Sequence, residues 1–451
     1  MRVQRMAGLA TAAVLGLTVV AVWPADAATT TPSDAALNLA HETLAPDDGW
    51  AAAGTGTTGG SAADDAHVFV ASNRAELVAA LGGNNATNGS NATPKIIFLK
   101  GKINANVDDA NQPLTCDDYA DPAYSLDQYL ATYDPAVWGR VPPSGPLEDA
   151  RVRSTRNQRA RIMLNVGPNT TIVGLKNAWL QGGNLLLTNV SNVIIRNVSF
   201  EDAHDCFPAW TPTDGAEGNW NSLYDNVTLS GATNVWLDHN TLTDGDNQDA
   251  NQPILLGRPF QVHDGLIDII RGSDFVTVSW NNLFEHDKSM LIGSTNTPGV
   301  DVGKLRVTLH HNRFANLGQR LPRVRFGQVD VYNNYYYLTD EDVFQYAWGV
   351  GVFSSPYVEN NFVLRSADIP LDAVVFDWRG GQPGQMTEIG SMTRVGTGPI
   401  QAVNFLDEYN AAHDPDIPTD AGWVPVLRGA VDPTQAVPGL VSAKAGARLL
   451  H

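Results

Sequence analysis

Residues 234–242 read NVWLDHNTL, and residues 275–284 and 305–314 read FVTVSWNNLF and LRVTLHHNRF. Each stretch alternates apolar with small or polar residues and then reaches an asparagine, which is typical of a β-strand that ends in a turn. Similar stretches occupy 192–200, 329–337 and 357–364. One asparagine from each stretch gives a series with steps of 43, 41, 31, 21 and 27 residues: Asn197, Asn240, Asn281, Asn312, Asn333 and Asn360.

This spacing favours a coiled stack of strands over a sandwich. The shortest step is about one coil of a β-solenoid, and the longer steps leave room for inserted loops. Asparagines that recur at one turn can stack as a ladder of hydrogen-bonded amides. A sandwich would show more even spacing and more Asn-Gly or Asp-Gly hairpins. We therefore predict an all-β chain that folds as a single-domain parallel β-helix with long loop insertions.

The N-terminal residues resemble an export signal. Residues 1–27 begin with Arg2 and Arg5, continue with an apolar run at 10–22 and end with the small-residue sequence Ala-Asp-Ala. We expect residues 28–47 to be irregular and 48–451 to form the domain, with a short N-terminal helix at 72–83 and another short helix at 147–158. Since no other stretch approaches about 20 apolar residues, we expect a secreted, extracellular protein without a membrane segment.

Charge and cysteine content narrow the possible partners. The formal net charge of −19 argues against nucleic acid, because phosphate backbones need a basic face. Cys116 and Cys206 are the only cysteines, and an oxidising destination permits a disulfide between them, the alternative being two separate thiols.

The period of the asparagines also predicts which acidic residues are neighbours. Asp225 lies 15 residues before Asn240, whereas Asp264 and Asp268 lie 17 and 13 residues before Asn281. They therefore share nearly one position on two adjacent coils, which are about 4.8 Å apart. Three clustered carboxylates suit a hard cation such as calcium. For any single aspartate, a turn or cap role is the alternative. Zinc is not expected, because neither a cysteine pair at ligand spacing nor an HExxH motif occurs.

Cationic residues follow the same period. Lys288 comes 7 residues after Asn281, and Arg320 comes 8 residues after Asn312, so both are expected at one groove. The segment RLPRVR at 320–325 adds Arg323 and Arg325. Since guanidinium groups pair with carboxylates in a two-pronged geometry, this segment indicates an anionic partner. The alternative is a solvated strand or an internal ion pair.

Several longer segments resemble the secreted bacterial calcium-dependent pectate lyases of polysaccharide lyase family one. They are YDNVTL at 224–229, NVWLDHNTLTDG at 234–245, HDGLIDI at 263–269, HDKSMLIGS at 286–294 and LRVTLHHNRFANLGQRLPRVRFGQVDVYNNYYY at 305–337. The resemblance extends from about residue 48 to the C-terminus. It implies a right-handed parallel β-helix and cleavage of polygalacturonate by β-elimination, which leaves a 4,5-unsaturated end.

The resemblance also implies roles for individual residues. Asp225, Asp264 and Asp268 match calcium ligands, and Lys288 and Arg325 match residues that bind substrate carboxylates. Arg320 matches the catalytic base, a role that conflicts with a free arginine pKa above 12 and requires a strongly lowered pKa or a transient neutral form.

Three other functions remain as alternatives. A pectin lyase would act on methylated substrate without calcium. A polygalacturonase would need paired acid and base carboxylates. A non-catalytic polysaccharide-binding solenoid would need no base at all. We expect the chain to act on pectate as a monomer and in the endo mode, since a long open groove favours internal cleavage.

Overall fold

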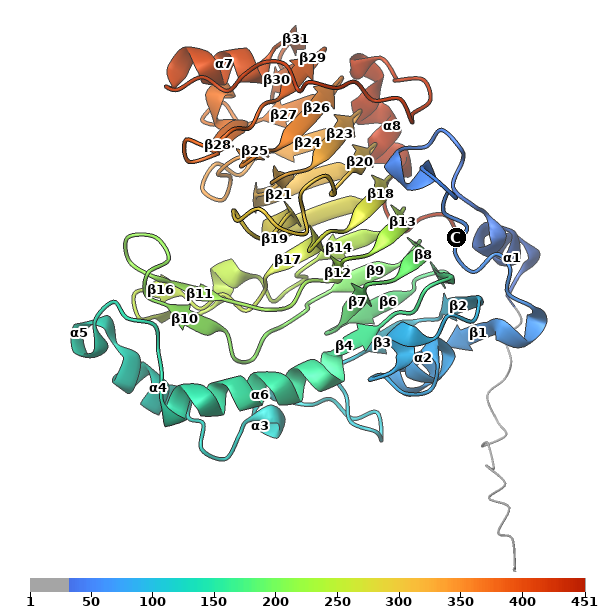
Figure 1. Cartoon of the computed structure of the whole chain (residues 1–451), viewed down its shortest axis with the longest axis vertical. Helices are drawn as coiled ribbons and strands as arrows, with labels where there is room; N and C mark the ends of the chain where they lie inside the picture. The colour runs from blue at the N-terminus through green and yellow to red at the C-terminus, as the bar shows by residue number, and fades with distance from the viewer. Residues whose placement is uncertain (1–31, 451) are drawn as a thin grey trace, which may run out of the picture. The chain divides into compact units, whose positions relative to one another are not determined.

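The computed structural model describes residues 32–450, and most of their strands stack as parallel coils (Figure 1). One sheet contains ten strands in the order of the chain, each parallel to the next. These strands are β1 (Val68–Ala71), β2 (Lys95–Leu99), β5 (Thr170–Gly174), β8 (Ser191–Arg196), β13 (Thr233–Asp238), β18 (Asp274–Ser279), β20 (Val307–His310), β23 (Gln328–Tyr332), β26 (Ser355–Glu359) and β29 (Thr387–Ile389).

The second sheet contains 17 strands and forms the remaining sides of the coils. They are β3 (Lys102–Asn104), β4 (Met163–Asn165), β6 (Trp179–Gln181), β7 (Asn184–Thr188), β9 (Ser199–Glu201), β12 (Val227–Ser230), β14 (Thr241–Thr243), β17 (Gly265–Ile270), β19 (Asn282–Ile292), β21 (Arg313–Gln319), β22 (Arg323–Val324), β24 (Tyr335–Leu338), β25 (Trp348–Gly351), β27 (Phe362–Arg365), β28 (Val375–Trp378), β30 (Met392–Val395) and β31 (Gln401–Ala402). Within this sheet, as far as residues 32–450 show it, only β31 pairs antiparallel. The predicted parallel β-helix is confirmed.

The core is a column of aliphatic side chains from successive coils. Because strand side chains alternate between the two faces, every second residue of the ten-stranded sheet points inward. The paired register stacks the buried residues Ile195, Leu237, Val278, Leu309, Val331 and Val358. Burying such side chains contributes roughly 1.5–3 kcal/mol each. The coils therefore hold one register along the column.

A ladder of buried asparagine amides marks one corner of the coils. The Nδ2 group of Asn240 donates to Oδ1 of Asn281 at 3.0 Å, and Asn281 donates in the same way to Asn312 at 3.0 Å. The ladder continues through Asn334 and ends at Asn361. The predicted amide ladder is therefore present.

The predicted register is wrong by one residue on three coils. Asn197, Asn333 and Asn360 have φ values of 58°, 53° and 51°, so they turn the chain in the left-handed region that asparagine tolerates. The residue after each of them points inward: Asn334 and Asn361 join the ladder, and Val198 takes the corresponding place on the first coil.

The helices confirm part of the prediction. Helix α2 (Arg74–Leu81) lies within the predicted 72–83, with Asn73 as its N-terminal cap. Helix α6 (Pro146–Ile162) is longer than the predicted 147–158. Helices α3 (Cys116–Tyr119), α4 (Leu126–Tyr133), α5 (Pro135–Trp138), α7 (Phe405–Ala412) and α8 (Val437–Lys444) were not predicted.

The prediction of an irregular segment at 28–47 is wrong for residues 34–41 and holds for 42–47. Ser33 caps helix α1 (Asp34–His41), whose Ala36 and Ala40 pack against Phe98 of the β-helix. Small side chains allow this close approach. The proposed export signal at 1–27 lies outside the described residues. No helix among residues 32–450 is long and apolar enough to cross a membrane.

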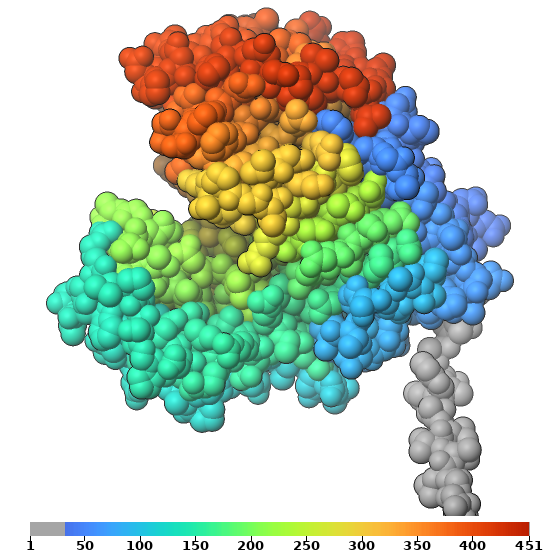
Figure 2. Space-filling model, viewed as in Figure 1, coloured from blue at the N-terminus to red at the C-terminus, as the bar shows by residue number. Residues whose placement is uncertain are grey.

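A lobe of inserted loops extends from the side of the coils (Figure 1). It contains α4, α5 and the hairpins β10 (Ala209–Thr211)–β11 (Asn219–Asn221) and β15 (Ile254–Leu255)–β16 (Arg258–Pro259). Its centre is an aromatic cluster that includes Tyr129, Trp220 and Phe260. The predicted disulfide between Cys116 and Cys206 is formed. Figure 2 shows a recess between this lobe and the coils at about 290–380.

Candidate active site

Three aspartates from two adjacent coils meet beside β12 and β17. Asp225 lies two residues before β12, Asp264 directly precedes β17, and Asp268 lies within β17. The pairing of Thr228 with Asp268 sets the two strands side by side. One carboxylate oxygen from each aspartate lies within 4.8 Å of the other two. The structure thus brings together the three residues that the asparagine period grouped.

Local contacts fix the orientation of the buried carboxylates. Asp225 accepts hydrogen bonds from the Thr228 hydroxyl and from the amide of Gly265, at 2.9 Å for the amide. Asp268 accepts from the amide of Leu291 at 3.3 Å. A Cβ atom at Gly265 would lie 2.7 Å from Asp268 Oδ1 and 2.9 Å from Asp225 Oδ1. A side chain at Gly265 would push both carboxylates aside, so glycine leaves them room to converge.

The carboxylates repel one another in a setting with little water. Burial, followed by the charges of Asp268 and Asp264, raises the pKa of Asp225 well above its usual value. Burial and the charge of Asp264 raise the pKa of Asp268 to about 7, although Arg320 partly offsets them. A bound cation would relieve this repulsion. The all-oxygen donor set fits calcium, which prefers carboxylate and water ligands.

Two cations border the aspartates on the next coils. Lys288, in β19, pairs in register with Gly265, and its Nζ lies 3.7 Å from Asp264 Oδ1. Nζ also donates to Gln261 Oε1 at 3.2 Å. Arg320 follows β21, and its Nη1 lies 3.9 Å from Asp264 Oδ1. The predicted convergence of Lys288 and Arg320 on the aspartates is therefore present.

Arg320 occupies an unusual backbone conformation and electrostatic environment. Its φ is 62°, which is uncommon for a residue with a side chain. Its buried Nε has no hydrogen-bond partner among the described residues. Burial lowers the pKa of Arg320, but the charges of Asp264 and Asp268 outweigh it and leave the pKa above its ordinary value. Without a metal ion, the neighbouring acids thus keep Arg320 charged.

The other two arginines of RLPRVR extend the cationic surface. The Arg323 guanidinium lies 3.9 Å from the centre of the Trp378 ring. Arg325 donates from Nε to Asn296 Oδ1 and from Nη1 to the Gly293 carbonyl, both at 2.7 Å. Burial, followed by Arg323 and Arg320, lowers the pKa of Arg325 to about 10. Neither Arg323 nor Arg325 has a carboxylate within ion-pair distance in residues 32–450, so the alternative of an internal ion pair is wrong for both.

A buried histidine that sequence reasoning did not single out joins two of these residues. His286, in β19, faces both carboxylate oxygens of Asp244 with Nδ1 at 2.8 Å. Its Nε2 lies 3.0 Å from the Asp264 carbonyl and 2.9 Å from the Lys288 carbonyl. Burial lowers the pKa of His286, but the charge of Asp244 raises it further, so the net shift is upward. A doubly protonated ring satisfies all of these acceptors.

A second buried histidine lies beside the first. His263 contacts Asp202 through Nε2 at 3.0 Å and Asp249 through Nδ1 at 3.1 Å. Although burial opposes protonation, Asp244, Asp202 and Asp249 raise the pKa of His263 to about 10. His263 directly precedes Asp264, and His286 lies two residues before Lys288. In the sequence, the position of each histidine beside a predicted site residue, in HDGLIDI and HDKSM, could have identified both histidines as part of the site.

Comparisons with known proteins agree with this arrangement. A family model described as pectate lyase matches residues 146–380. A pectate lyase of Bacillus subtilis (strain 168) is 45% identical over 98% of this chain and 99% of its own length. Pectate lyase E of Dickeya chrysanthemi is 36% identical over 73% of this chain and 70% of its own.

Solved structures give the same result. A thermostable pectate lyase superposes with a TM-score of 0.89 at 49% identity, covering 92% of this chain and all of the other. A pectate lyase bound to a hexasaccharide gives a TM-score of 0.85 at 44% identity, with the same coverage. Together with the parallel coils and the cluster of acids and arginines, these similarities show that the chain belongs to the pectate lyase family.

Proposed function

We propose that the protein cleaves de-esterified polygalacturonate by calcium-assisted β-elimination and acts within the polymer. The observation that supports this best is the close approach of three acidic and two basic side chains from neighbouring coils. Asp225, Asp264 and Asp268 supply only oxygen donors, and Lys288 and Arg320 border them. A polyanion thus finds local positive charge on a chain of net charge −19.

In this mechanism the reaction removes the proton on C5 of a uronate and expels the oxygen on C4. The electron pair of the C5–H bond forms the C4=C5 double bond, and the departing oxygen takes a proton from water. Calcium held by Asp225, Asp264 and Asp268 would bind the uronate carboxylate and stabilise the charge that develops beside C5. Lys288 and Arg325 orient the sugar acid through its carboxylates.

Arg320 is the proposed base, and its Nη1 accepts the C5 proton. When no cation is bound to them, Asp264 and Asp268 keep this guanidinium positively charged. A cation on the aspartates cancels that effect, and the neighbouring Arg323 and Lys288 then favour the neutral form. Since proton abstraction needs the neutral form, we expect an alkaline pH optimum.

We also propose that residues 1–27 direct secretion. The Cys116–Cys206 disulfide supports an oxidising destination. Digestion of plant polysaccharide outside the cell requires such export.

The test of the reaction is the ultraviolet absorbance of the unsaturated product during digestion of polygalacturonate. We expect absorbance to rise with calcium, to stop with excess EDTA and to resume when calcium is restored. Hydrolysis or simple binding would give no rise. Undiminished turnover after exhaustive chelation, with preference for methylated substrate, would indicate a pectin lyase instead.

A matched pair of variants tests the calcium ligands. We expect Asp264→Asn to remain folded and to bind calcium more weakly, because the site loses one formal charge. Asp407→Asn, an exposed change on α7, is the control and should behave as wild type. Normal calcium affinity in Asp264→Asn would contradict the assignment.

A further inference from the structure

A cavity of about 280 Å³ lies beside the Cys116–Cys206 disulfide, apart from the three aspartates of the proposed calcium site. Asp202, His204 and Asn247 line it together with the disulfide. The proposed reaction uses none of these residues. The cavity is nevertheless polar, and it is large enough to admit a hydrated ion.

Three metal-ligating side chains converge beside this cavity, and two of them, Asp202 and His204, line it. One oxygen of Asp202 and one nitrogen each of His204 and His263 lie within 4.8 Å of one another. Asp202 Oδ1 and His263 Nε2 are 3.0 Å apart, close to the separation of two atoms that share a zinc ion at about 2.0–2.1 Å. The residues come from different coils, because Asp202 follows β9 and His263 precedes β17.

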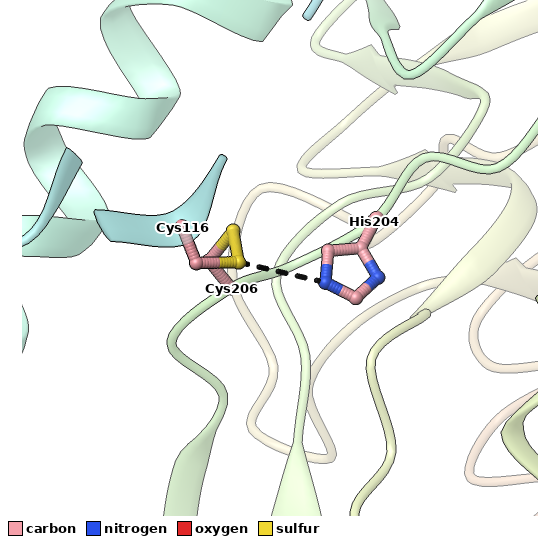
Figure 3. Close-up of side chains that lie close together, drawn as sticks. All are labelled: Cys116, His204 and Cys206. Atoms are coloured by element: carbon pink, nitrogen blue, oxygen red, sulfur yellow. Dashed lines mark hydrogen bonds between the residues drawn. A yellow bond between two sulfur atoms is a disulfide. The ribbon is translucent and has the colours of Figure 1, made fainter. Parts of the chain in front are cut away.

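The ring of His204 has one unprotonated nitrogen that could bind a metal in place of its present hydrogen bond. Its Nε2 points to Cys116 Sγ at 3.9 Å, and the other ring nitrogen points away from the disulfide (Figure 3). A disulfide sulfur carries no proton, so Nε2 must carry the hydrogen of this contact. Nδ1 is then unprotonated, which agrees with the Asn247 Nδ2 donor 3.0 Å from it. An unprotonated imidazole nitrogen such as this Nδ1 can coordinate a metal ion.

Asn247 can supply a fourth donor. Its Nδ2 lies 2.8 Å from Asp202 Oδ1 and 3.0 Å from His204 Nδ1, so the amide occupies the space between these two ligands. Rotating the amide by half a turn exchanges Nδ2 and Oδ1 and turns an oxygen toward the same space. The Gln252 side chain, now 2.7 Å from Asn247 Oδ1, can make the matching rotation.

His263 already has the outer contact that orients a metal-binding imidazole. Its Nδ1 lies 3.1 Å from Asp249 Oδ1, and such a carboxylate fixes the ring so that Nε2 faces the metal. Without metal, Nε2 donates to Asp202. A metal ion would take the place of that proton.

We propose that Asp202, His204, His263 and Asn247 form a second metal site, which takes a divalent first-row transition ion such as zinc. Two imidazoles with two oxygens suit zinc, whereas calcium prefers oxygen donors alone. The ion would connect the segment after β9, which the disulfide attaches to α3, with the segment that leads into Asp264.

Zinc binding to the intact, calcium-saturated protein tests this proposal. We expect one equivalent of zinc by calorimetry and by metal analysis after dialysis. His204→Gln should weaken binding at least tenfold. His413→Gln is the matched control, since His413 is an exposed histidine 3.0 Å from Asp372 and should leave zinc binding unchanged. Absence of stoichiometric zinc binding, or equal affinity in His204→Gln, would overturn the proposal.

Two further measurements distinguish the proposed site from a misfolded variant and from zinc that binds at the calcium ligands. Cobalt added to the wild-type protein should give the intense visible absorption of a four- or five-coordinate ion, and only the weak bands of octahedral cobalt would count against the site. Asp225→Asn should lose calcium affinity and retain zinc. Loss of zinc in that variant would assign the ion to the calcium ligands and refute the second site.

Discussion

Two groups of aspartates lie on neighbouring coils and differ in what lies between them. In the first group, Asp225 and Asp268 face each other and Asp264, and burial with mutual repulsion raises the pKa of both. In the second group, Asp202 and Asp249 are also buried, but hydrogen bonds to His263 outweigh burial and lower the pKa of both. The same side chain is thus driven toward opposite protonation states.

This difference in pKa shifts suggests different roles for the two groups of aspartates in the metal-free protein. The first group lacks internal neutralisation and is suited to bind a cation together with an anionic substrate. In the metal-free protein the second group is neutralised by histidines, so it does not depend on calcium, and the proposed zinc ion would replace the proton between Asp202 and His263. His286 is neutralised by Asp244 and holds the backbone in place at the carbonyls of Asp264 and Lys288. The following predictions test whether chemistry and support are divided in this way.

The largest effect is expected at Arg320. Arg320→Lys keeps a positive charge but loses the planar guanidinium and its geometry. If Arg320 removes the C5 proton, kcat should fall by about 10²–10⁴-fold, the usual contribution of acid–base catalysis, with little change in KM. Steady-state kinetics on polygalacturonate measures this. A change in KM alone would mean that the base has been misassigned.

His286→Gln tests the supporting group. Glutamine cannot bridge Asp244 and both carbonyls, so Asp264 and Lys288 should be less firmly placed. We expect calcium affinity to fall by roughly 10-fold or more, as for other outer contacts of metal sites, and kcat to recover largely at saturating calcium. Calcium titration by calorimetry measures the first effect. Unchanged calcium affinity, with His413→Gln as the reference, would show that His286 only fills space.

Arg325→Lys should act mainly on substrate binding. The planar group now makes two hydrogen bonds, to Asn296 and Gly293, which an ammonium cannot reproduce in the same geometry. Loss of one charged hydrogen bond corresponds to a KM increase of about tenfold. The kinetic comparison with Arg320→Lys is decisive, because a purely kcat effect at Arg325 would reverse the two roles.

The smallest effect is a pH dependence of stability. The folded pKa of Asp268, about 7, lies above the ordinary value of 3.8, so the folded state binds more protons between these pH values. In the calcium-free protein, stability from this group should therefore be lost as pH rises from about 4 to 7. Thermal unfolding of the wild type in chelator, compared with Asp268→Asn, should show a difference of a few degrees in the pH dependence of Tm.

Calcium provides the control for this pH effect. Because it binds the ionised carboxylates, it should raise Tm more at pH 8 than at pH 5. An equal increase at both pH values would mean that the aspartates do not titrate as a repelling group.

The sequence predicted the stack of coils and the first group of aspartates because both follow from the regular spacing of the asparagines along the chain. Alternating apolar residues and recurring asparagines define a coil, and the offset from Asn240 or Asn281 places Asp225, Asp264 and Asp268 together. The one-residue error at Asn333 and Asn360 arose because two adjacent asparagines are equally good candidates by spacing. Only the backbone angle separates the residue that turns from the residue that stacks.

The second group of aspartates could not be found in the same way. Asp202 directly follows β9, but its partners Asp249 and His263 lie in the long loop between β14 and β17, whose path the period does not fix. The exclusion of zinc from local motifs has the same weakness, since His204 and His263 come from different coils. Helix α4 was missed because its buried residues, Tyr129 and Tyr133, pack on aromatic residues of distant hairpins.

The asparagine ladder sets where this chain can change length during evolution. Deleting one residue between Asn281 and the strand before it would move an amide out of the stack and send every following side chain to the other face. An insertion in the lobe between β14 and β17 disturbs no amide of the ladder. New substrate preferences can therefore arise by lengthening or exchanging the loops that border the recess, while the coils that carry the aspartates and Arg320 stay the same.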